Sequence, residues 1–257
     1  MAHPMMATLE RELILYRRLW QASVFSSFLL PLLFVLSIGV GVGNYITGGV
    51  DGVPYLNYVV PGVLVTTAFQ IAIGESTYPV LGGFKWQRSY HAMRATPVQP
   101  VHMVGGHLLY LVFRAEVATV CFLIVVGLFG AIDSWWALAT LPVVALVSVA
   151  SAAPVTAFAA SIENDSYFSL LFRFGLIPAT LFSGVFFPVT QLPELFRPLA
   201  YLSPLWHGVV LSRAATLGEL PPGETWLAML GHVGYLVLWG VVGLALAVWR
   251  FGKRLQD

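Results

Sequence analysis

Charged residues and cysteines are both scarce in this 257-residue sequence. Asp, Glu, Lys and Arg together make up 10% of the chain, and the net charge of +1 gives no reason to expect a nucleic-acid partner. Cys121 is the only cysteine, which excludes a disulfide framework and a metal site made of several thiolates. We expect Cys121 to be a packing residue, because it lies in the middle of an apolar run.

Catalytic and nucleotide-binding motifs are absent from the sequence as well. It contains no Gly-x-x-x-x-Gly-Lys-Ser/Thr phosphate loop, no Gly-x-Ser-x-Gly or His-Glu-x-x-His motif and no paired Asp signature. A lipid transferase or an intramembrane protease would need converging groups of this kind, so a membrane-embedded enzyme is disfavoured. We expect no enzymatic activity, no metal site and no cofactor bound by this chain.

The residues that are abundant are hydrophobic. They make up 58% of the chain and give a mean hydropathy of +0.81, which is more apolar surface than a soluble core of this length can bury. Six apolar runs have about the 20 residues that a membrane helix needs. They fall at about 23–43, 58–81, 104–129, 136–160, 168–187 and 226–249. We therefore expect an all-α integral membrane protein whose six transmembrane helices occupy residues 23–249.

The distribution of Lys and Arg predicts the orientation of these spans. Six spans put both termini on one side. The segments on that side carry Arg11, Arg17 and Arg18 before the first span, Lys85, Arg88 and Arg94 after the second, and Arg250, Lys253 and Arg254 in the tail 250–257. The connections on the other side carry only Arg197 and Arg213. Because cytoplasmic loops are enriched in cations, both termini are expected to be cytoplasmic.

Residues 1–22 are expected to form a cytosolic amphipathic helix before the first span. Leu9, Leu13, Tyr16 and Trp20 recur at helical spacing and share one face, with the charges mostly elsewhere. This pattern favours a helix that lies in the membrane interface over a frayed tail.

The connection between the second and third spans contains another helix-sized piece, at about 84–97, which ends before Pro97. Its spacing predicts one face of aromatic and apolar side chains with cations beside it. These residues are Trp86, Tyr90 and Met93 on the face, and Arg88 and Arg94 flanking it. Such a face suits a groove on a soluble partner, and it suits the surface of an anionic membrane equally well.

Glu75, Arg114 and Glu116 are ionisable residues inside predicted spans, where each needs a partner or a polar cavity. Glu75 and Arg114 lie at similar depth on neighbouring spans, so we predict an ion pair between them. The pair could be a structural tie between helices or a substrate or proton site. An ion-coupled transporter or channel that uses all three residues as a relay is the alternative function. His107 and His232 are assigned no chemistry.

The run 168–187 carries a stripe of side chains at spacings of four and three residues. The stripe consists of Phe168, Phe172, Gly175, Ala179, Phe182 and Phe186, so its ends are aromatic and its middle is small. The Gly175/Ala179 pair would allow another helix to approach closely. The stripe could form a protomer contact, an aromatic wall along a path for an amphipathic cargo, or internal packing. Pro178 predicts a kink.

Prolines interrupt the apolar segment that follows. Pro188, Pro193, Pro198 and Pro204 recur every five or six residues. Broken backbone enters hydrocarbon only where protein covers it, so residues 188–216 are predicted to form a re-entrant helical hairpin with two helices on either side of Pro204. The hairpin would close the outer end of a pathway, with Glu194 and Arg197 near the rim. A plain surface loop is disfavoured because several large apolar side chains would be exposed to water.

The order of these features resembles one known family. The stretches that carry the resemblance are "GESTY" at 74–78, "YHAMRATPVQPVHMVGGHLL" at 90–109 and "FSGVFFPVTQLPELFRPLAYLSPLWHGVVLSR" at 182–213. They resemble the type-2 ABC (ABC-2) exporter permeases over nearly the whole chain. The branch that looks most similar exports nodulation lipo-oligosaccharides and daunorubicin-type drugs.

This resemblance implies a permease of the bacterial cytoplasmic membrane that pairs with itself or with a sister permease. It would bind two copies of a separate ABC ATPase, which would hold ATP and Mg²⁺, and 84–97 would be the coupling helix seated on that ATPase. The cargo would pass between the two permeases, surrounded by membrane lipid, with the hairpin at the exit. A drug, a lipo-oligosaccharide, a glycolipid or a lipid-linked glycan would each fit as an amphipathic cargo.

Overall fold

The structure is a computed structural model that describes residues 3–256 except 38–40, 42–48, 51, 131 and 133. Within this part of the chain the regular elements are helices, and the strand-like pairing is limited to one bridge between Val50 and Val53. The all-α class predicted from the sequence is confirmed for these residues.

Four helical stretches are long and apolar enough to cross a membrane in the described part of the chain. They are α2 (Tyr55–Ser76) continued by α3 (Tyr78–Lys85), α5 (Pro100–Leu128), η2 (Trp135–Ala139) continued by α6 (Thr140–Ala159), and α11 (Trp226–Arg254). Their lengths of 31, 29, 25 and 29 residues exceed the length that a span requires. They cover four of the six predicted apolar runs, so the helices predicted there are confirmed.

The N-terminal helix α1 (Pro4–Leu36) is one continuous helix of 33 residues. The predicted boundary between an interface helix 1–22 and a first span beginning at 23 is therefore wrong. No proline or glycine stands near residue 22 to end a helix there. The end of the predicted first run, from residue 38 onward, lies mostly outside the described residues.

The apolar face of the first part of α1 lies against α5. Gly106 of α5 allows a close approach, because a Cβ atom added there would lie 2.6 Å from Cβ of Thr8. Tyr16 packs edge-on against Tyr110, with 6.3 Å between ring centroids. The face predicted to rest in the membrane interface is thus covered by protein, except at Trp20, whose side chain is exposed.

The fifth apolar run forms a shorter, irregular helix. It consists of α7 (Ser166–Leu170), the π-helical turn η3 (Leu171–Leu176) and α8 (Ile177–Phe182). The π-helical turn ends at Leu176, two residues before Pro178, which lacks the amide hydrogen of a regular turn. The kink predicted at Pro178 stays a prediction. The predicted run 168–187 extends too far, because the helix ends at Phe182.

The proline-rich segment forms short helices that begin at its prolines. It contains η4 (Val189–Gln191), α9 (Arg197–Leu202) and α10 (Pro204–Leu217). Pro198 and Pro204 occupy the first turns of α9 and α10, where the missing amide hydrogen costs no helical bond. The two helices predicted on either side of Pro204 are confirmed. Ser203 caps α10 by accepting a hydrogen bond from the amide of Leu205 at 3.3 Å.

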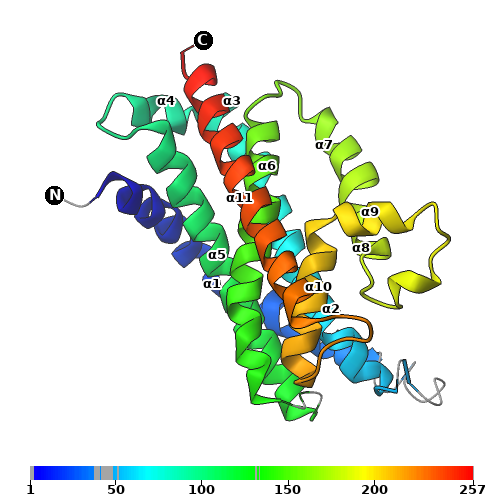
Figure 1. The fold of residues 1–257 in the computed structure, drawn as a ribbon. Coiled ribbons are helices and arrows are strands. Elements are labelled where there is room, and N and C mark those ends of the chain that lie inside the picture. The colour runs from blue at the N-terminus through cyan, green and yellow to red at the C-terminus, as the bar shows by residue number, and fades with distance from the viewer. Residues whose placement is uncertain are drawn as a thin grey trace.

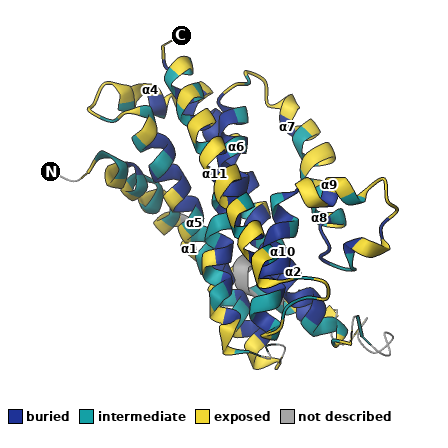
Figure 2. Cartoon of the chain, in the orientation of Figure 1, coloured by how far each residue is buried: buried dark blue, intermediate teal, exposed yellow. Residues whose placement is uncertain are grey.

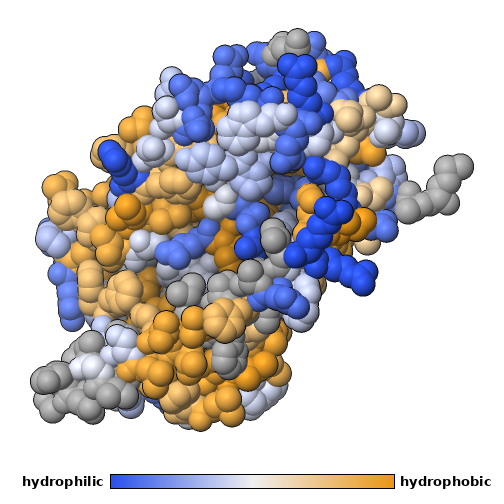
Figure 3. All heavy atoms as spheres, turned by 180° about the vertical axis from the view of Figure 1, so that it is seen from behind, coloured by the Kyte–Doolittle hydropathy of each residue, from blue (hydrophilic) through white to orange (hydrophobic). Residues whose placement is uncertain are grey.

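The helices pack as a bundle around α2, α6 and α10 (Figure 1). Buried residues concentrate on these helices, while α7, α9 and the outward side of α11 are largely exposed (Figure 2). The two chain ends and α4 (Ser89–Arg94) lie at the same end of the bundle, whereas α10 starts partway along it and runs to the opposite end (Figure 1). On the face shown in Figure 3, the end with the chain termini is mostly hydrophilic and the lower part is mostly hydrophobic.

Arg213 fixes α10 to its neighbours from inside the bundle. It is only 8% exposed, and its guanidinium lies 3.8 Å from the centre of the Tyr58 ring on α2. It donates hydrogen bonds to the carbonyl oxygens of Gly184 at 2.9 Å and Tyr58 at 3.3 Å. Arg213 lies in the second helix of the predicted hairpin 188–216, and its burial there was not predicted from the sequence.

Helix α11 packs against α6 through glycines that have no room for a side chain. A Cβ atom at Gly243 would lie 2.6 Å from Cδ and 2.8 Å from the nitrogen of Pro154, whose ring cannot move aside. Gly234 on the same helix has open space around its Cα.

We predict that Gly243→Ala lowers the thermal unfolding midpoint of the purified protein in detergent. Overpacking a fixed contact costs about 1–3 kcal/mol. The matched variant Gly234→Ala should unfold at the same temperature or higher, because Ala stabilises a helix interior relative to Gly by about 1 kcal/mol. Equal melting of the two variants would contradict the close contact between α6 and α11.

Candidate functional site

A polar cavity of about 540 Å³ opens at the end of the bundle that carries the chain termini. Side chains of α1, α2, α3, α4 and α5 line it. The charged and aromatic ones are Arg11, Glu12, Tyr16, Glu75, Tyr90, His107, Tyr110 and Arg114. Two carboxylates face two guanidinium groups in this cavity, so its charges balance.

The ion pair predicted between neighbouring spans is present in this cavity. Nη1 of Arg114 on α5 donates a hydrogen bond to Oε1 of Glu75 on α2, and both side chains are 26% exposed. Glu116 does not join them. Its Oε2 atom is buried and has no hydrogen-bond partner among the described residues. The structure therefore brings together two of the three predicted ionisable residues.

A second ion pair in the cavity was not predicted. Nη1 of Arg11 lies 3.0 Å from Oε1 of Glu12 on α1. His107 on α5 also lines the cavity, although it was assigned no chemistry. These residues could not be placed from sequence, because their position depends on the close packing of α1 against Gly106.

The predicted coupling helix 84–97 is not a single helix. α3 ends at Lys85, and Arg88 has a φ of +50°, a left-handed conformation that interrupts the chain before α4 begins at Ser89. Trp86 lies outside α4, whereas Tyr90 and Met93 are three residues apart within it, so the prediction that all three share one helical face is wrong.

Tyr90 is a core residue rather than part of an exposed face. It is 3% exposed, and its ring packs 4.7 Å from that of Phe84 and 5.0 Å from that of Phe251. Burial raises the pKa of its hydroxyl. Tyr90 thus connects α4 to α3 and to the end of α11.

The other residues of this region remain accessible. Trp86 is 58% exposed, Arg88 and Arg94 are exposed, and Met93 is partly buried. A second polar cavity, of about 560 Å³, adjoins them and is lined by Phe84, Lys85, Arg88, His91, Glu163 and Arg254. Cations from the α3–α4 turn and from the end of α11 therefore gather on one surface. The predicted tail 250–257 is mostly helical, because α11 continues to Arg254.

The stripe predicted on the fifth run is divided by the π-helical turn, which changes the helical register. Phe168 is fully buried and packs edge-on against Tyr78 at 4.8 Å. Phe172 packs at the edge of the core. Phe186 lies beyond the helix, so the prediction that it continues the stripe is wrong.

The small middle of the stripe lines an apolar cavity of about 360 Å³. Gly175, Ala179 and Phe182 form one wall, and residues of α2, α6, α9 and α11 form the others. This arrangement could hold an apolar group between the fifth run and the bundle.

The polar residues of the proline-rich segment have mainly structural contacts. Arg197 donates hydrogen bonds to the carbonyl oxygens of Leu192 at 3.0 Å and Thr190 at 2.8 Å. The side chain of Glu194 is 92% exposed, and its carboxylate lies 4.0 Å from Arg197. Pro193 lies within the turn that Arg197 closes, and Pro188 directly precedes η4. Exposed apolar side chains surround it: Leu195, Phe196, Leu199, Tyr201 and Leu202.

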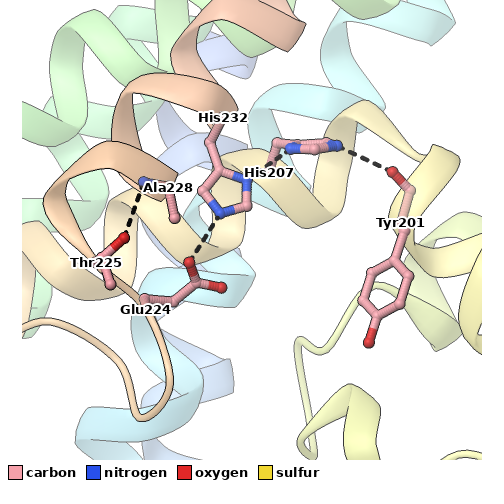
Figure 4. Close-up of polar contacts among 6 residues, drawn as sticks. All are labelled: Tyr201, His207, Glu224, Thr225, Ala228 and His232. Atoms are coloured by element: carbon pink, nitrogen blue, oxygen red, sulfur yellow. Dashed lines mark hydrogen bonds and ion pairs between the residues drawn. The ribbon is translucent and has the colours of Figure 1, made fainter.

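A buried pair of histidines joins α10 to α11 (Figure 4). Nδ1 of His207 lies 2.7 Å from Nδ1 of His232. The remaining ring nitrogens contact the carbonyl oxygen of Tyr201 at 2.9 Å and the carboxylate of Glu224 at 3.4 Å. This cluster could not be predicted from the sequence, because its members are separated by up to 31 positions and form no motif.

Comparison with known proteins agrees with the resemblance found in the sequence. The family model for the ABC-2 type transporter matches residues 4–217. The chain is 30% identical over 252 residues to nodulation protein J of Rhizobium leguminosarum bv. viciae, which covers 98% of this chain and 95% of that protein. It is 29% identical over 253 residues to nodulation protein J of Sinorhizobium fredii, covering 97% and 93%.

A relative named for transport belongs to the same set. The chain is 25% identical over 241 residues to the inner membrane transport permease YadH of Escherichia coli, covering 90% of this chain and 91% of that protein. The family model spans most of the chain, several of its helices are apolar enough to cross a membrane, and the relatives align over almost its whole length. This chain therefore belongs to the ABC-2 type transporter family and is a multi-pass membrane transport permease.

Proposed function

We propose that this permease exports an amphipathic molecule across the bacterial cytoplasmic membrane and that a separate ABC ATPase drives it. The observation that carries the proposal is the α3–α4 turn. The turn exposes Trp86 and Arg88, and the end of α4 exposes Arg94, at the end of the bundle that holds the chain termini. An exposed Trp with Arg beside it is typical of a protein-binding hot spot. The chain lacks a phosphate loop, so ATP and Mg²⁺ would bind to the partner.

The proposed topology has six crossings and both termini in the cytoplasm. α1, α2–α3, α5, η2–α6 and α11 would each cross, and the sixth crossing would be α7–α8, followed by the hairpin of α9 and α10. The end of the bundle with both termini and α4 (Figure 1), where Lys85, Arg88 and Arg254 gather, would face the cytoplasm. The hairpin would then enter from the outer side, where its exposed apolar side chains would contact lipid or a second permease.

The proposed cargo has both an apolar and a polar part. The apolar cavity beside Gly175 and Ala179 supports the first, and the charge-balanced cavity around the Glu75–Arg114 pair supports the second. A lipo-oligosaccharide, a glycolipid, a lipid-linked glycan or an amphipathic drug would satisfy both. Two ATPase copies and a second permease, identical or sister, would complete the transporter.

We predict that Trp86→Ala reduces the amount of ATPase that copurifies with the permease by about tenfold or more. Loss of a Trp hot spot costs about 2 kcal/mol or more. Arg88→Gly should weaken the complex too, because glycine adopts the positive φ without strain and the variant removes only the cation. Trp226→Ala is the matched control, since Trp226 is also exposed but lies at the opposite end. Unchanged copurification for both Trp86→Ala and Arg88→Gly would refute ATPase docking at this surface. Contact with anionic lipid would then be the remaining role for these residues.

The ion-coupled alternative rests on the presence of the Glu75–Arg114 pair, which could carry protons. Charge reversal distinguishes it from a structural tie. Glu75→Arg or Arg114→Glu alone should lower the folded yield, because each leaves two like charges in one partly buried cavity. The double reversal should restore both folding and vanadate-sensitive export.

A relay would give a different result from the same variants. The double reversal would fold but would not transport, Glu116→Gln would also abolish transport, and transport would depend on a proton gradient. We expect Glu116→Gln to export normally, because Glu116 does not contact the pair.

A further inference from the structure

The imidazoles of His207 and His232 form a continuous chain of polar contacts between two parts of the protein. The chain runs from the carbonyl oxygen of Tyr201 in α9, through His207 in α10 and His232 in α11, to Glu224 in the preceding loop (Figure 4). Both rings are buried, at 8% and 6% exposure. Water therefore has little access to repair an unfavourable contact.

The protons in this chain can be counted from the chemistry of its ends. A carbonyl oxygen only accepts hydrogen bonds, so Nε2 of His207 must carry a hydrogen. One further hydrogen lies between the two Nδ1 atoms, because their separation of 2.7 Å is that of a single hydrogen bond. If both rings are neutral, Nε2 of His232 is then left without a hydrogen.

The contact with Glu224 requires one more proton. A bare ring nitrogen and a carboxylate are both acceptors, and they would face each other at 3.4 Å. An added proton satisfies the contact wherever it resides: on His232, on Glu224, or on His207 with the hydrogen between the rings shifted. All three hydrogen bonds in this series can therefore form only when the series holds three hydrogens. Two neutral histidines and an ionised glutamate supply only two.

The groups around the pair restrict where this proton can go. Tyr235 of α11 stacks on His207 with 3.9 Å between centroids, and its hydroxyl donates to the carbonyl oxygen of Leu202. Trp206 of α10 packs edge-on against both imidazoles. Among the described residues, the titratable and charged groups facing the pair are Tyr235 and Glu224, and the structure records no contact between the pair and a titratable group of α2 or α6. Glu224 is thus the carboxyl group that contacts the pair in the described part of the chain.

We propose that His207, His232 and Glu224 form a buried binding site for one proton, and that the bound proton fastens the α9–α10 hairpin to α11. Without the proton, two acceptors oppose each other and the attachment loosens. Its consequence for transport, a hairpin released as the pH rises, rests on the proposed function. The proton site itself does not.

The variant Glu224→Gln distinguishes the need for an added proton from the need for the hydrogen bond itself. The side-chain amide of Glu224→Gln can donate a hydrogen to a neutral His232, so the chain would close without an added proton. Glu219→Gln changes an exposed carboxylate in the same loop and serves as the matched control.

The experiment measures hydrogen exchange of the α9 and α10 amides in the full chain in nanodiscs over a range of pH, corrected for intrinsic exchange rates. In the wild type and in Glu219→Gln, opening should increase with pH by up to about tenfold per unit, the linkage slope for one proton. In Glu224→Gln it should not vary with pH. A wild type without pH dependence, or a Glu224→Gln variant that retains it, overturns the proposal.

Should Glu224→Gln fail to fold, nitrogen NMR of the two histidines in the wild type decides the matter. A third hydrogen shared by the pair and Glu224 at low pH, lost as the pH rises, supports the proposal. Two neutral rings beside an ionised Glu224 at every pH overturn it. None of these measurements depends on the ATPase, so their failure leaves the proposed function intact.

Discussion

The need to pair every backbone polar group in an apolar bundle governs the most unusual part of this structure. Between the end of α8 at Phe182 and the start of α10 at Pro204, the chain has few helical hydrogen bonds of its own. Unpaired carbonyl groups in hydrocarbon would cost several kcal/mol each. Side chains supply the missing donors. They are Arg213 to Gly184, Arg197 to Thr190 and Leu192, His207 to Tyr201, and Tyr235 to Leu202.

These donors come from three places: the proline-rich segment itself, α10 and α11. The segment is therefore held by its neighbours, and its position depends on where those helices lie. Arg213 ties it to Tyr58 of α2, while the His207–His232 contact ties it to α11. A change in the packing of α2 or α11 would alter the donors available to the segment. In the proposed mechanism, this is how motion at the end with α4 would reach the hairpin, with whole helices moving as rigid bodies.

Sequence reasoning identified the features that depend on local chemistry. Hydrophobic runs of sufficient length predicted four of the helices, and the proline spacing predicted the two helices around Pro204. The similar depth of Glu75 and Arg114 in neighbouring spans predicted their ion pair. It failed where tertiary contacts decide the outcome. The left-handed Arg88 divides the predicted coupling helix, a π-helical turn shifts the register of the Phe168 stripe, and packing on α5 covers the face of α1. The histidine pair needed three separate segments to be placed in space.

The central claim is that this chain is a passive permease that a separate ATPase drives from the end with α4. The most direct measurement is transport of a fluorescent amphipathic substrate in vesicles that contain the purified permease, with and without its ATPase, at equal pH on both sides. The account predicts transport that requires both the ATPase and hydrolysable ATP. Transport by the permease alone, driven by an imposed proton gradient, would contradict it.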